Sequence, residues 1–158
     1  MSTKDSPERE ASIRLEGHAP RVLVIQAPYY ADVVGGMRSA AQRVLEAAGA
    51  TVETADVAGA FELPAALRMA LGRGYKGYVL LGCVVRGETD HYTFICDAVC
   101  HGVMSISAET GAAIGFGLLT VDNLDQAVAR SRDDRMNKGA EAAHAMLAQV
   151  AFRRRILA

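Results

Sequence analysis

A short stretch near the middle of the chain combines an anion-binding pattern with a proton-transfer group. Gly87, Glu88 and Thr89 follow an apolar, β-branched run, and His91 comes next, where a helical pattern begins. A strand followed by a glycine turn and a helix directs unpaired backbone N–H groups toward an anion. A histidine with an ordinary pKa of about 6.5 exchanges protons at neutral pH. The pattern therefore indicates a phosphate site with an acid–base group beside it.

Other positions hold side chains suited to a flat, polar ligand. Tyr29, Phe61 and Phe116 are aromatic, and Glu62 is a carboxylate that could accept hydrogen bonds from hydroxyl groups. Each also has a plainer interpretation, because aromatic residues pack in cores and carboxylates favour helix starts. Taken singly, Tyr29, Glu62 and Phe116 fit the plainer interpretation better. For His91 the functional interpretation is favoured, because the anion-binding pattern immediately precedes it.

Apolar runs and helical spacings alternate along the rest of the chain. Strands are predicted at 21–26, 51–57, 78–81 and 113–119, with a break at Gly82. Helices are predicted between and after them, with Asp122 or Asn123 and then Asn137 as N-caps. This alternation favours a parallel sheet covered on both faces. Ligands bind beyond the carboxyl ends of such strands, where we expect Tyr29, Phe61, Glu88 and Phe116 to meet in one site.

Four blocks of the sequence resemble the lumazine synthase family. They are residues 59–64 (GAFELP), 82–92 (GCVVRGETDHY), 115–120 (GFGLLT) and 137–139 (NKG), and the resemblance extends from about Val22 to Ala143. It implies a flavodoxin-like three-layer α/β/α sandwich around a four-stranded parallel sheet. In this view residues 21–158 form a single domain and residues 1–20 a flexible N-terminal arm. The resemblance also implies a homopentamer at least, with each active site shared between adjacent subunits.

The same resemblance implies an activity and a set of site residues. Family members condense 5-amino-6-(D-ribitylamino)uracil with 3,4-dihydroxy-2-butanone 4-phosphate in riboflavin synthesis, and they need no cofactor or metal. His91 matches the proton-transfer residue. The residues that match the site for the uracil amine are Tyr29, Ala60, Phe61, Glu62, Cys83, Val84, Val85 and Phe116, the last from the adjacent subunit. Those that match the site for the butanone phosphate are Gly87, Glu88, Thr89, Arg130 and Lys138.

Composition narrows the kind of protein. The chain has 158 residues and a net charge of −1, which does not favour a nucleic-acid partner. No run approaches the ~18 apolar residues of a membrane span, and the polar start is unlike a signal peptide, so we expect a cytoplasmic enzyme. Cys83, Cys96 and Cys100 fit a reducing compartment. A metal site is a poor alternative to inert thiols, because the chain has no CxxC pair.

Two other functions compete with catalysis. One is a non-catalytic lumazine- or flavin-binding assembly protein on the same scaffold. The presence of Thr89, His91 and Arg130 argues against it, because binding alone requires no proton-transfer group. The other is an unrelated flavodoxin-like phosphate or nucleotide binder. The turn at Gly87 is neither a GxGxxG nor a Walker loop, which argues against this second alternative.

Overall fold

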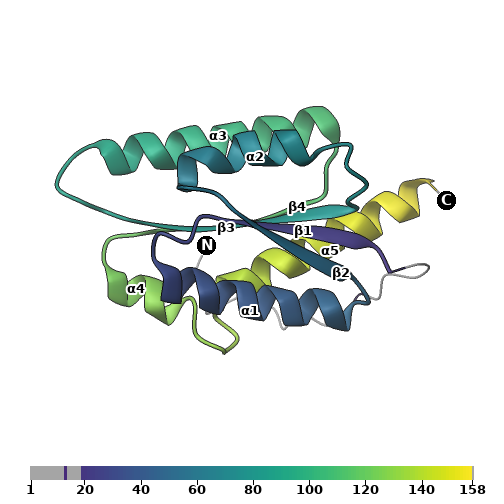
Figure 1. Ribbon diagram of the computed structural model, residues 1–158, viewed down its shortest axis with the longest axis horizontal. Helices are drawn as coiled ribbons and strands as arrows, with labels where there is room; N and C mark the ends of the chain where they lie inside the picture. The colour runs from purple at the N-terminus through teal and green to yellow at the C-terminus, as the bar shows by residue number, and fades with distance from the viewer. Residues whose placement is uncertain (1–12, 14–18, 158) are drawn as a thin grey trace.

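Four parallel strands form one sheet in the order β2-β1-β3-β4 in the computed structural model, which describes residue 13 and residues 19–157 (Figure 1). The strands are β1 (Arg21–Gln26), β2 (Thr51–Asp56), β3 (Gly77–Val85) and β4 (Ile114–Val121). The helices are α1 (Ala31–Ala47), α2 (Leu63–Ala70), α3 (His91–Thr110), α4 (Leu124–Ala129) and α5 (Lys138–Leu157), and a 3₁₀ turn at Ala60–Glu62 precedes α2. The predicted four-stranded parallel sheet is confirmed.

Helices cover both faces of this sheet. Figure 1 shows α2 and α3 on one face and α1, α4 and α5 on the other. Along β1, Val22 and Val24 join the core beneath α1 and α5, whereas Leu23 and Ile25 join the core beneath α2 and α3. A strand that is buried on both faces needs apolar residues on both of them, and residues 22–25 of β1 are all apolar. The predicted three-layer α/β/α architecture is thereby confirmed.

Two asparagine caps fix the helices that follow β4. The Asn123 side chain accepts a hydrogen bond from the Gln126 N–H at 3.0 Å and starts α4. The Asn137 side chain accepts from the Gly139 N–H at 2.9 Å, and its amide donates to the Ser131 carbonyl at 2.9 Å. Both predicted caps are confirmed. Because Asn137 is also buried, it ties the start of α5 firmly to the preceding segment.

The predicted break in the third strand at Gly82 is wrong, because β3 continues to Val85. A Cβ atom built on Gly82 would lie 2.9 Å from the Leu118 side chain, so the glycine makes room for a neighbour within the sheet. Beyond it, Cys83, Val84 and Val85 pair with residues 119–121 of β4. This pairing extends both strands past the ends that the sequence predicts.

The extension of β4 changes the place of Phe116. The strand runs to Val121 rather than ending at Leu119, and Phe116 pairs with Leu80 in its first half. The prediction that Phe116 falls at or just past the carboxyl end of its strand is therefore wrong. The apolar pattern predicts that the strand ends at Leu119, because it carries no information on the pairing of Thr120 and Val121 with β3.

Most of the predicted N-terminal arm, residues 1–20, lies outside the described residues. Within the described part, Ile13 packs against the core beneath α1 and α5. None of the helices in that part is both long enough and apolar enough to span a membrane.

Candidate active site

The carboxyl ends of three strands bring the predicted proton-transfer residue next to an aromatic ring. Tyr29 follows β1, Phe61 lies in the 3₁₀ turn after β2 with Ala60 and Glu62, and His91 begins α3 after β3. The ring centroids of Phe61 and His91 are 6.0 Å apart, with an interplanar angle of 53°. Tyr29 is 78% exposed and Phe61 45%. Rings left this open offer faces on which a flat ligand can stack.

The strand β3 reaches past its neighbour β1 and leaves one backbone edge open. Pairing with β1 stops at Leu81, whose carbonyl accepts a hydrogen bond from the Ala27 N–H at 2.9 Å. From Cys83 to Val85 the backbone pairs only with β4 among the described residues. The opposite edge of these residues is free to bond the polar edge of a ligand. This placement suits the backbone contacts that the sequence resemblance implies for Cys83, Val84 and Val85.

The loop between β3 and α3 leaves backbone donors unpaired. Gly87, Glu88 and Thr89 are exposed, and their backbone N–H groups donate no hydrogen bond within the described chain. No side chain caps α3, and the Thr89 hydroxyl makes only a long contact, 3.4 Å, with the His91 N–H. A Cβ atom on Gly87 would meet nothing within 4 Å, and its φ is not left-handed. The glycine leaves space for an anion near these donors.

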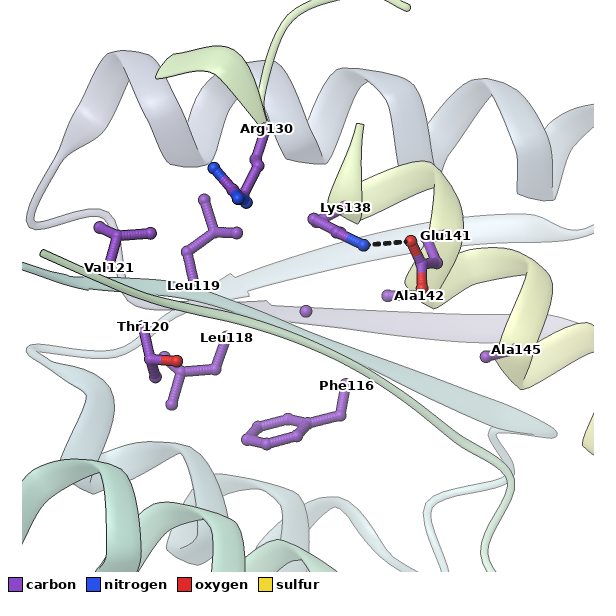
Figure 2. Close-up of a pocket in the computed structure, with 11 residues that line it drawn as sticks. Phe116, Leu118, Leu119, Thr120, Val121, Arg130, Lys138, Glu141, Ala142 and Ala145 are labelled. Atoms are coloured by element: carbon purple, nitrogen blue, oxygen red, sulfur yellow. Dashed lines mark hydrogen bonds and ion pairs between the residues drawn. The ribbon is translucent and has the colours of Figure 1, made fainter. Parts of the chain in front are cut away.

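A second group of charged residues lines a cavity of about 260 Å³ alongside β4 (Figure 2). Arg130 follows α4 and donates through Nη1 to the Gln126 carbonyl at 2.9 Å. Lys138 begins α5, and its backbone N–H donates to the Arg130 carbonyl at 2.9 Å. Figure 2 shows both cationic side chains on the same side of β4, above Leu119. Two cations at one cavity suit a ligand such as a phosphate dianion.

The sequence reasoning missed a carboxylate in this cavity. Glu141 lines it too, and its Oε2 lies 2.6 Å from the Lys138 Nζ. The sequence does contain a signal for this ion pair: Lys138 and Glu141 are three residues apart, a spacing that places both side chains on one face of a helix. This ion pair holds Lys138 and offsets its charge. Among the described residues Arg130 has no carboxylate partner, so its guanidinium is the better placed of the two to bind an anion.

The predicted site residues fall into two groups within one chain. Figure 2 shows Phe116 and Thr120 on the face of β4 opposite to Arg130 and Lys138. We find no hydrogen bond, ion pair or ring contact in the described part of the chain that joins Phe116, Arg130 or Lys138 to the Phe61–His91 pair. The structure thus brings together Phe61, which follows β2, and His91, which follows β3, and it places Tyr29 after β1 at the same carboxyl edge of the sheet. It places Arg130 and Lys138, with the edge residue Phe116, apart from them.

The three thiols have little nucleophilic character. Burial raises the pKa of Cys83 to about 11, and burial also raises the pKa values of Cys96 and Cys100. A thiol with a raised pKa stays protonated at neutral pH, and the thiolate is the reactive form. Cys83 is buried as expected, whereas Cys96 and Cys100 are half-buried. Among the described residues, no three His, Cys, Asp or Glu side chains are grouped so that they could hold a metal ion.

Comparison with known proteins agrees with the four sequence blocks. The family model for 6,7-dimethyl-8-ribityllumazine synthase matches residues 19–154. A protein of Kineococcus radiotolerans with that name is 43% identical over 153 residues, which cover 95% of this chain and 92% of the relative. The protein of the same name from Afipia carboxidovorans is 37% identical over 142 residues, covering 86% and 87% of the two chains. The chain therefore belongs to the 6,7-dimethyl-8-ribityllumazine synthase family.

Proposed function

We propose that this protein is a 6,7-dimethyl-8-ribityllumazine synthase of riboflavin biosynthesis. It condenses 5-amino-6-(D-ribitylamino)uracil with 3,4-dihydroxy-2-butanone 4-phosphate and releases phosphate and water. The observation that carries the proposal is the His91 imidazole beside the Phe61 ring, next to the unpaired donors of the loop after β3. Membership of the family supports it. The steps move protons, water and phosphate, so the proposal includes no cofactor.

The uracil amine is proposed to occupy the carboxyl end of the sheet. Its flat ring would stack on the exposed faces of Tyr29 and Phe61. The open edge of β3 from Cys83 to Val85 would bond the polar edge of the ring. Glu62, exposed in the same turn as Phe61, would accept hydrogen bonds from the ribityl hydroxyls. These contacts would orient the reacting amine toward His91.

The butanone phosphate is proposed to bind beside the amine. Its phosphate would accept hydrogen bonds from the backbone N–H groups of Gly87 and Glu88 and from Thr89, with Arg130 neutralising its charge. The amine attacks the carbonyl carbon, and loss of water gives an imine. Phosphate then leaves, and the second amine closes the ring with loss of another water. His91 would transfer protons in these steps, because an imidazole both accepts and donates them near neutral pH.

The direct test is to mix the purified protein with both substrates and to follow lumazine formation by its fluorescence. We expect a rate well above that of the spontaneous condensation. A rate equal to the spontaneous one, together with measurable binding of lumazine, would instead favour the non-catalytic binding protein.

The active site is also proposed to be shared between adjacent subunits of a cytoplasmic homo-oligomer, a homopentamer at least, built from a single domain of residues 21–158. Its support is that no hydrogen bond, ion pair or ring contact within the described chain joins Phe116, Arg130 or Lys138 to the Phe61–His91 pair. A ring in which each chain offers one group to each neighbour would complete every site. We expect light scattering to show this oligomer and no active monomer.

Mixing two impaired variants, assayed at a butanone phosphate concentration below the wild-type KM, tests the sharing directly. His91→Ala removes one half of the site and Arg130→Ala the other, so a chain of each kind can complete one intact site between them. When equal amounts are unfolded together and reassembled, roughly a quarter of the sites should be intact, because neighbours associate at random. Activity should rise well above the sum of the two variants. Reassembly of each variant alone is the control, and a mixture no better than that sum would contradict a shared site.

A further inference from the structure

Arg86 connects three elements at the start of the loop that precedes α3. Its backbone N–H donates to the Val121 carbonyl, at the end of β4, at 2.8 Å. Its Nε lies 3.1 Å from the Asp122 carboxylate. Its guanidinium carbon lies 4.2 Å from the centroid of the Tyr92 ring, in the first turn of α3. One side chain thus joins the end of β3 to the residues after β4 and to the helix that begins with His91.

The residues that follow Arg86 have no comparable contacts. Residues 87–90 are exposed, and their described hydrogen bonds reach only the first turn of α3: the Thr89 hydroxyl accepts from the His91 N–H at 3.4 Å, and the Asp90 carbonyl accepts from the Phe94 N–H at 3.2 Å. Gly87 stands in open space. The place of this loop relative to the sheet is therefore set at its two ends. Arg86 makes contacts at both of them, through Asp122 on one side and Tyr92 on the other. A loop held at its ends loses less conformational freedom when a ligand binds.

We propose that Arg86 is a positioning residue, which holds the loop of residues 87–91 in the geometry that binds the phosphate of the substrate. The proposal rests on the proposed function for the identity of that substrate. The Arg86–Asp122 pair is about half exposed on the arginine side, so it adds little to global stability. Its effect should therefore appear in ligand binding rather than in the unfolding temperature. By holding Tyr92, Arg86 would also orient the neighbouring His91.

The alternative is that the Arg86 guanidinium binds the phosphate directly. Variants of its partners separate the two explanations, because they leave the arginine in place. If Arg86 acts by positioning, Asp122→Asn and Tyr92→Leu should weaken phosphate binding much as Arg86→Gln does. If Arg86 binds the ligand itself, the two partner variants should leave binding unchanged or strengthen it, because they free the guanidinium.

The chain contains a matched control at the opposite end of the sheet. Arg21 has the same kind of partners, with its Nε 2.7 Å from the Glu53 carboxylate and its guanidinium carbon 4.4 Å from the Tyr75 ring centroid. It begins β1, at the amino end of the sheet, away from the loop of residues 87–91. Arg21→Gln removes an exposed arginine with a carboxylate and a tyrosine partner, as Arg86→Gln does. It should leave phosphate binding and kinetics unchanged.

The experiment measures the dissociation constant of inorganic phosphate by calorimetry, and kcat and KM for both substrates, in the full-length protein. For Arg86→Gln, Asp122→Asn and Tyr92→Leu we expect roughly three- to tenfold weaker phosphate binding and a similar rise in KM for the butanone phosphate. KM for the uracil amine should change little, and Arg86→Lys should restore part of the affinity. The unfolding temperatures should stay near that of the wild type.

Three other outcomes overturn the proposal, each in a distinct way, and a fourth concerns the proposed function instead. Weaker binding in Arg86→Gln alone would show direct contact, and unchanged binding in all three variants would show that Arg86 has no role. A wild type that binds no phosphate would remove the site that Arg86 is proposed to position. A wild type that binds phosphate but forms no lumazine would refute the proposed function, while the phosphate measurements would still decide the role of Arg86.

Discussion

Replacing Arg130 with alanine is expected to raise KM for the butanone phosphate by about ten- to over a hundredfold, the value of one charge-assisted hydrogen bond. KM for the uracil amine should change little, because Arg130 lies in the cavity beside β4 and not among the stacking rings. Inorganic phosphate should also become a weaker competitor of the phosphorylated substrate. Arg130→Lys should recover only part of the loss, because an ammonium group cannot reproduce the planar fork.

Steady-state kinetics with each substrate varied in turn provides the measurement. Arg135→Ala is the matched control, because Arg135 is an exposed arginine in the adjoining segment and its loss changes the net charge equally. The Arg130 side chain bonds only a carbonyl of its own helix in the described structure, so its removal should not unfold the protein. Equal weakening toward both substrates would indicate a damaged subunit interface and would refute the role assigned to Arg130.

Replacing His91 with alanine is expected to lower kcat by about a hundredfold, the low end of the usual contribution of a general acid–base group. The low end is expected because the two substrates also condense without an enzyme, so positioning supplies part of the acceleration. The stacking rings and the phosphate donors remain, so both KM values should change little. His91 is exposed at the start of α3, so its replacement should not impair folding.

The measurement is kcat for the variant after subtraction of the spontaneous rate. His101→Ala is the matched control, because His101 is an exposed histidine further along α3 whose ring nitrogen contacts only the Asp97 carbonyl, at 2.8 Å, in the described structure. Its kcat should equal that of the wild type. An undiminished kcat for His91→Ala would show that this imidazole is structural, and the proton transfers would then need another group or solvent.

The elements of the fold could be predicted because their signals are local. The apolar run 21–26 predicts a strand buried on both faces, and Asn123 and Asn137 predict helix starts through bonds within three residues. Gly111 has a left-handed φ of 63° and ends α3, as a glycine after the last helical residue commonly does. The ends of β3 and β4 were predicted too early because they depend on pairing between residues distant in sequence, such as Val85 with Val121.

The candidate site divides in the same way. The sequence alone determined which residues follow the strands, because Gly87 and His91 come soon after a buried run, and the family resemblance identified Phe61 and Arg130. Only the tertiary structure decided that Arg130 is grouped with Lys138 and Glu141 beside β4, apart from the Phe61–His91 pair. The physical reason is that β4 is an edge strand. The spacing of residues along the chain does not show on which face of the sheet the helices after β4 pack. It also does not show which of their side chains come to lie beside this strand.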